Sequence, residues 1–258
     1  MPYLRRKYEL GFSVQYFITS CSHKSKNNIG LTTFMKAFIL TIGLIFAGMN
    51  TPTPEIKLPQ NQWVTLPQTQ FCHATNGQTA PQPTQVKLKY DDQYLHVQFD
   101  CAQNPFVGQN TYKQHNTELW NQEVFELFIA EGTATPTRYL ELEINPNNAL
   151  FVGWIDNPSG ENPANLEFVA YEKSQIRHDV KIKRDAWEGQ MQIPWALLGG
   201  KKENYRLNFF RIISLESHPE PNWKGSPADC AYLCWNSTIS GPTPRFHRPS
   251  AFGVLHLE

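Results

Sequence analysis

The sequence predicts an all-β protein, an antiparallel β-sandwich with at most one or two short helical turns. Three observations indicate this class. Apolar and polar residues alternate along many short segments, turn residues separate these segments, and no alternation of strands with long helices is visible. With 40% hydrophobic and 13% aromatic residues the chain can bury a sizeable core. Charged residues are 18% and form no polybasic face, which argues against nucleic-acid binding.

The N-terminal part predicts export. Residues 35–48 have a positive start, an apolar run and small residues at the end, which is typical of a secretory signal with cleavage between Ala47 and Met49. Residues 1–34 are then an upstream extension. The apolar run is shorter than the roughly 20 residues of a membrane-spanning helix. Two alternatives stay open, namely a lipoprotein signal that ends at Cys21 and a cytosolic N-terminus. We expect a periplasmic or extracellular protein.

The rest of the chain predicts a Pro-rich extended segment, residues 50–62, followed by one domain, residues 63–258. Its clearest signal is a hairpin of residues 86–90 and 94–99 around an Asp-rich turn, and one helical turn is expected after Pro194. The strands expected from alternation are 86–90, 94–99, 123–129, 139–144, 149–155, 168–171, 180–183, 187–193, 205–213, 232–235 and 252–257.

Alternation also predicts which side chains share a sheet face. Tyr139, Glu141 and Glu143 lie on one face of their strand, and Glu126 joins that face if its strand is the neighbour. Trp120 precedes the strand of Glu126 and is expected at the rim. Aromatic rings beside carboxylates suit sugar recognition, because rings stack on C–H faces and carboxylates accept hydroxyl hydrogen bonds. We expect this face to be polar and exposed.

The cysteines predict one disulfide, Cys72–Cys101, which closes a loop worth roughly 3 kcal/mol in the chain-entropy model. Cys230 and Cys234 would lie about 13 Å apart along a strand, too far to bridge. Two alternatives stay open: four buried free thiols, and a zinc site of Cys72, His73, Cys230 and Cys234, whose spacing matches no familiar zinc motif.

Several segments, taken in order, resemble the family 9 carbohydrate-binding modules and their wider DOMON-like relatives. They cover nearly all of residues 63–258. The resemblance implies a stand-alone member with a jelly-roll or DOMON-like sandwich. It also implies a protein that is not an enzyme and that supports polysaccharide breakdown or uptake. The matching segments are 86–97, 119–129, 138–146, 187–195, 207–211 and 246–257.

The resemblance also implies a binding site in which two aromatic rings hold a sugar and polar groups bind its hydroxyls. Trp120 and Glu126 match the first ring and its carboxylate, and the second ring would be Trp235 or Phe246. No cofactor is required, although Ca²⁺ would fit as a structural ion. The expected partners are mono-, oligo- or polysaccharides and secreted glycoside hydrolases. The expected site residues are Trp120, Glu126, Tyr139, Glu141, Asn208, Arg211, Trp235 and Phe246.

Three rival functions stay open. The same fold can serve as a structural or protein-interaction module. A glycoside hydrolase would pair Glu126 with Glu141 or Glu143, but carboxylates on a flat exposed face lack the burial that separates their pKa values. A DOMON-type haem carrier would need a Met ligand, for which Met191 is the candidate in the body of the chain.

Overall fold

The computed structural model of the protein describes residues 53–68 and 70–258. The predicted signal, its cleavage site and Cys21 lie outside these residues. Residues Asn50–Glu258 form one compact unit. Within the described part, no helix has the length and apolar character needed to cross a membrane.

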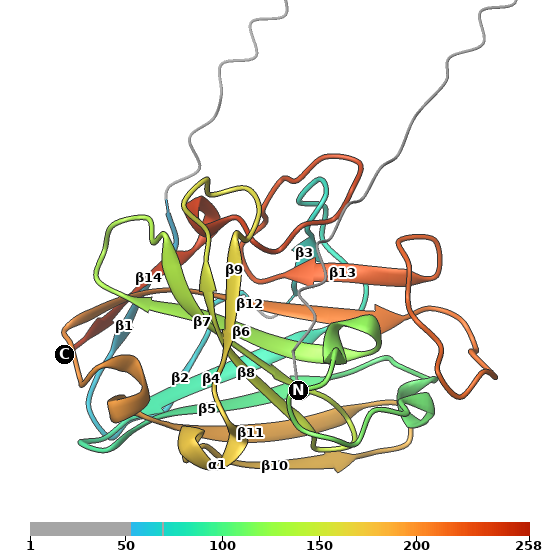
Figure 1. Ribbon diagram of the computed structural model, residues 1–258, viewed down its shortest axis with the longest axis horizontal. Coiled ribbons are helices and arrows are strands. Elements are labelled where there is room, and N and C mark those ends of the chain that lie inside the picture. The colour runs from blue at the N-terminus through green and yellow to red at the C-terminus, as the bar shows by residue number, and fades with distance from the viewer. Residues whose placement is uncertain (1–52, 69) are drawn as a thin grey trace, which may run out of the picture. The chain divides into compact units, whose positions relative to one another are not determined.

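Two β-sheets build the unit, and they confirm the predicted all-β sandwich (Figure 1). The nine-stranded sheet contains β1 (Glu55–Leu58), β3 (Cys72–His73), β6 (Val124–Glu131), β7 (Arg138–Ile144), β8 (Leu150–Asp156), β9 (Asn165–Phe168), β12 (Asn204–Ser214), β13 (Cys230–Cys234) and β14 (Gly253–Leu257). The five-stranded sheet contains β2 (Val64–Thr65), β4 (Thr84–Tyr90), β5 (Tyr94–Cys101), β10 (Arg177–Ile182) and β11 (Trp187–Pro194). Short helical turns are η1 (Val107–Gln109), η2 (Leu119–Asn121), α1 (Tyr171–Ser174), η3 (Trp195–Leu198) and η4 (Pro249–Ala251).

The strand order brings distant parts of the chain together. The nine-stranded sheet runs β1-β14-β12-β6-β7-β8-β9, with β13 paired to β12 and β3, and the five-stranded sheet runs β10-β11-β5-β4-β2. All neighbours are antiparallel except β1 and β14. The centre of the larger sheet is therefore formed by β12, β6 and β7.

Most expected strands are present within a few residues, and η3 is the turn expected after Pro194. One expectation is wrong, because residues 168–171 are not a strand: β9 ends at Phe168 and α1 begins at Tyr171. The short strands β1, β2 and β3 were not expected. Strand β1 lies in the segment predicted to be merely extended, and it gains a parallel partner in β14.

Apolar residues form two clusters, one on each face of the nine-stranded sheet. The first lies between the sheets and includes Phe99 stacked on Phe125 with ring centres 4.0 Å apart. The second lies on the outer face and includes Phe128, Phe151 and Phe210. Neighbouring residues of β6 enter the two clusters in alternation, as the pleat requires. The outer cluster is covered by loops rather than by a third sheet.

Two of these loops lie close to the outer face. One joins β8 to β9, and the other runs from β13 to η4; both rise at the top of Figure 1. Asn157, at the start of the first loop, donates a hydrogen bond to the carbonyl of His247 in the second, at 3.0 Å. The loops therefore hold each other and leave a hollow between themselves and the sheet.

Candidate functional site

A groove of about 440 Å³ opens over the outer face of the nine-stranded sheet. Its walls come from separate parts of the chain. Trp120 projects from η2, Glu126 from β6 and Glu141 from β7, while Phe246 and His247 come from the loop before η4. Four of the eight expected site residues therefore line one hollow: Trp120, Glu126, Glu141 and Phe246.

Two aromatic rings flank this groove. Trp120 is 36% exposed and contacts Phe151 edge-on, with ring centres 5.4 Å apart. Its neighbour Leu119 is buried and anchors the turn. Phe246 is 8% exposed and stacks on Phe210 at 4.5 Å. Trp120 therefore offers a supported ring to a ligand, whereas Phe246 offers only a small part of its surface.

Three carboxyl groups lie together at this groove: Glu126 and Glu141 line it, and Glu143 is buried next to them. Glu126 and Glu143 are direct cross-strand partners, and Glu141 follows on the same face. One oxygen from each lies within 4.8 Å of the others. This confirms the prediction that the acids share a face. The expectation that the face is exposed is wrong, because Glu126, Glu141 and Glu143 are only 1%, 6% and 0% exposed.

Burial changes the acidity of all three carboxyl groups. It raises the pKa of Glu141 to about 8. Burial also raises the pKa of Glu126, with the Glu141 charge adding to the effect. The pKa of Glu143 is raised first by burial and then by the charges of Glu126 and Glu141. The sequence-based argument against a glycoside hydrolase, that these carboxylates lack the burial that separates pKa values, therefore does not hold.

Tyr139 stands behind the groove rather than in its wall. It is buried, and its hydroxyl lies 2.8 Å from Nδ1 of His247. Burial lowers the pKa of His247 to about 4, so this ring is neutral at physiological pH. His247 was not among the expected site residues, because a single His in a loop carries no motif. Tyr139 positions His247, which does line the groove.

Arg211 does not belong to this site. It is fully buried between the sheets and forms an ion pair with Glu123 at 3.3 Å. It also donates to the carbonyls of Pro83 and Ala102. The physical reason is the pleat, since Arg211 shares the inner face of β12 with Phe209. The expected role of Arg211 in sugar binding is wrong.

Asn208 and Trp235 are also placed away from the groove. Asn208 is buried and locks the loop after β13, because its amide donates to the carbonyl of Asn236 and accepts from the N–H of Asn236. Trp235 is 2% exposed in the core between the sheets. Its ring packs so closely on Gly253 that a Cβ there would lie 2.5 Å from Cζ3. Neither side chain can reach a ligand in the groove.

The expected Cys72–Cys101 disulfide is absent, since all four described cysteines are free and buried. The partners belong to different sheets: Cys101 ends β5, whereas Cys72 in β3 pairs with Cys234. Burial raises the pKa of the Cys101 thiol to about 12. The alternative zinc set does not converge either. Among the described residues, the ligand groups that converge are Glu126 with Glu141 and Glu143, and Cys230 with His218 and Asp229.

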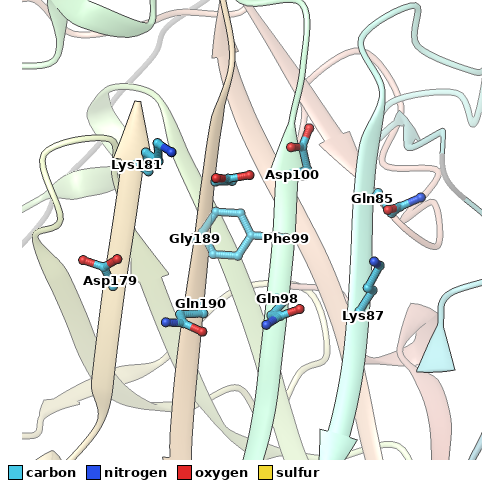
Figure 2. A pocket seen from close by; sticks show the side chains of 10 residues that line it. Gln85, Lys87, Gln98, Phe99, Asp100, Asp179, Lys181, Gly189 and Gln190 are labelled. Carbon is cyan, nitrogen blue, oxygen red and sulfur yellow. The ribbon is translucent and has the colours of Figure 1, made fainter. Parts of the chain in front are cut away.

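A second hollow lies on the five-stranded sheet and is also about 440 Å³ in volume (Figure 2). Gln98, Gln190 and other polar side chains of β4, β5, β10 and β11 line it. At one end Lys183 pairs with both Asp100 and Glu188. The aromatic member of its lining, Phe99, is 3% exposed. This hollow lacks the exposed ring that Trp120 gives to the first, and we take the first as the site.

Comparison with known proteins supports the fold. No protein-family model matches the chain. A curated protein of Arthroderma benhamiae named "Extracellular protein" is 27% identical over 178 residues, which is 65% of this chain and 79% of that protein. A solved structure from Bacteroides uniformis, described as a candidate carbohydrate-binding protein, superposes with a TM-score of 0.55 at 13% identity. The match covers 80% of this chain and all of that one.

A family 9 carbohydrate-binding module from Caldicellulosiruptor kristjanssonii, solved in complex with cellotriose, gives a TM-score of 0.46 at 15% identity. The match covers 79% of this chain and 93% of the module. The Bacteroides structure is the one that shows the shared fold. This chain therefore shares the β-sandwich fold of the Bacteroides protein.

Proposed function

We propose that the chain is an exported, non-catalytic module that binds a sugar in the groove beside Trp120. The observation that carries the proposal is that the 36% exposed Trp120 residue and the buried carboxyl groups of Glu126 and Glu141 line one hollow. An indole face packs on the C–H groups of a sugar, and Glu126 and Glu141 bind its hydroxyls. The protein from Bacteroides uniformis that shares the fold is itself described as a candidate carbohydrate-binding protein.

Two further observations support parts of this proposal. The relative from Arthroderma benhamiae is named as extracellular, which agrees with export. Glu126 and Glu141 lie on adjacent strands in one wall of the groove. A glycosidase instead places its two carboxyl groups on either side of the scissile bond. Met191, the candidate ligand of the haem alternative, packs in the core between the sheets and lines neither of the two hollows.

The test is a titration of the purified protein with mono- and oligosaccharides, measured by calorimetry and Trp fluorescence. The Trp120→Ala variant is expected to lose at least about tenfold in affinity, or roughly 1.4 kcal/mol, because it removes the stacking ring. Its melting temperature should stay close to that of the wild type.

The matched control is Trp63→Ala. Trp63 is 42% exposed, next to β2 in the other sheet, where it contacts His96 edge-on. This variant should bind sugar as the wild type does. Equal losses in both variants would remove the groove from the mechanism. Silence of the folded wild-type protein across the whole sugar panel would refute sugar binding and leave a structural or protein-interaction module.

A further inference from the structure

Three carboxyl groups that have no positively charged partner among the described residues lie together at the groove and directly beneath it. The cluster consists of Glu126 from β6 and of Glu141 and Glu143 from β7. One oxygen Oε1 of Glu126 and both carboxylate oxygens of Glu143 have no hydrogen-bond partner. Through all described residues, no Lys, Arg or His forms an ion pair with any of the three.

Such an arrangement has a large energetic cost without a compensating charge. An isolated buried carboxylate costs several kcal/mol after relaxation, and three close together also repel one another. The apolar cluster on the same outer face, which includes Phe128, Phe151 and Phe210, supplies no positive charge. Either protons or a bound cation must therefore neutralise the cluster.

The geometry fits a small, hard cation. The oxygens lie within 4.8 Å of one another, which is about twice a Ca²⁺–O distance of roughly 2.3–2.6 Å. Oxygen-only donors favour Ca²⁺ or Mg²⁺ over the metals that prefer nitrogen or sulfur. Glu143 is fully buried and does not line the groove, so an organic ammonium in the groove would not reach it. A single ion between the strands would reach all three.

We propose that Glu126, Glu141 and Glu143 form a binding site for a divalent cation of the Ca²⁺ class. Two of the ligands face the groove, so the open side of the ion faces water or a ligand there. Ca²⁺ takes six to eight oxygens, and up to six come from the three carboxylates, with the rest from the groove. The proposal does not depend on sugar binding.

The test uses purified full-length protein, stripped with EDTA and titrated with Ca²⁺ alone and with Mg²⁺ alone. Calorimetry should show saturable Ca²⁺ binding with a Kd of about 1 mM or tighter, in the range of extracellular modules. The melting temperature should rise with Ca²⁺ concentration, because the folded state binds the ion. Glu143→Gln and Glu126→Gln should each weaken binding at least about tenfold and abolish most of the thermal shift.

The control variant is Glu188→Gln, which changes an exposed carboxylate on the other sheet that pairs with Lys183. It should keep the full response to Ca²⁺. Glu143→Gln removes a buried charge, so we expect this variant to fold in EDTA. Its response to Ca²⁺ can then be compared with that of the wild type. No response of the wild type to either ion would overturn the proposal and assign shared protons to the cluster. A response that persists in both cluster variants would overturn it too, because the ion would then bind elsewhere.

Discussion

Replacing Arg211 by Met should destabilise the protein while leaving ligand binding intact. Arg211 is fully buried between the sheets and lies 3.3 Å from Oε1 of Glu123. Its guanidinium also donates to the carbonyls of Pro83 and Ala102. Met fills most of the same space without a donor. In the variant, the carboxylate of Glu123 keeps one hydrogen-bond donor, the indole N–H of Trp187 at 2.6 Å.

The expected cost is about 3–5 kcal/mol, because removal of one member of a buried ion pair strands the charge of the other. That is a large part of a total stability of about 5–15 kcal/mol. In urea, with a slope of about 1–3 kcal/mol/M, the midpoint should fall by at least about 1 M. Adding Glu123→Gln should recover part of the loss, since Gln keeps an acceptor for Trp187 and carries no charge.

Urea unfolding followed by Trp fluorescence measures the loss, and calorimetry below the transition measures ligand affinity. Arg138→Met is the control. Arg138 pairs with Asp156 and Glu167 at 2.6 Å each, but its side chain is 43% exposed, so its loss should cost at most about 1 kcal/mol. A cost below about 1 kcal/mol for Arg211→Met would refute the reasoning. Reduced ligand affinity of the folded Arg211→Met variant would also refute the reasoning, because Arg211 would then contribute to the binding site.

Three further results are expected. Gly253→Ala should cost about 1–3 kcal/mol in urea unfolding, because its Cβ would meet the Trp235 ring at 2.5 Å, whereas Gly108→Ala, with open space around it, should be neutral. The pKa of His247 is about 4 in the folded state and about 6.5 in the unfolded state. The free energy of unfolding should therefore fall as the pH drops from about 6.5 to 4, by at most roughly 3 kcal/mol. The variant His247→Gln should lack this part of the pH dependence. Ellman's reagent should react slowly with the folded residues 50–258 and should count four thiols after denaturation, those of Cys72, Cys101, Cys230 and Cys234; a count lower by two would indicate a disulfide.

The sequence predicts the sandwich and the shared face of its acids because both follow from local rules. A strand with period-2 alternation places every second side chain on one face, whatever covers that face. Glu126, Glu141 and Glu143 accordingly meet at one point. Exposure is different, since it depends on loops that arrive from far along the chain. Residues of the β8–β9 loop and of the loop from β13 to η4 line the groove together with Glu126 and Glu141, and no local pattern predicts that these distant segments meet there.

Some errors could have been avoided with the same local rule. Asn208 and Arg211 are an odd number of residues apart in one strand, so they must point to opposite faces and cannot bind one ligand together. The structure places Asn208 toward the outer loops and Arg211 in the core between the sheets. Cys72 and Cys101 show the opposite case, because their separation in two sheets follows from topology, which the spacing of cysteines does not encode.

The outer face of the nine-stranded sheet combines an apolar cluster with three buried carboxyl groups. An apolar cluster under loops is already a second core, and stability alone would favour apolar residues at the positions of Glu126 and Glu143, because replacing buried charges by packed hydrophobic groups is often stabilising. Three carboxylates at the centre of such a cluster therefore do not hold the fold together. Their cost is offset by protons or by a bound cation. Trp120 lines the same groove as Glu126 and Glu141, so a ligand held there would contact both the ring and the carboxyl groups.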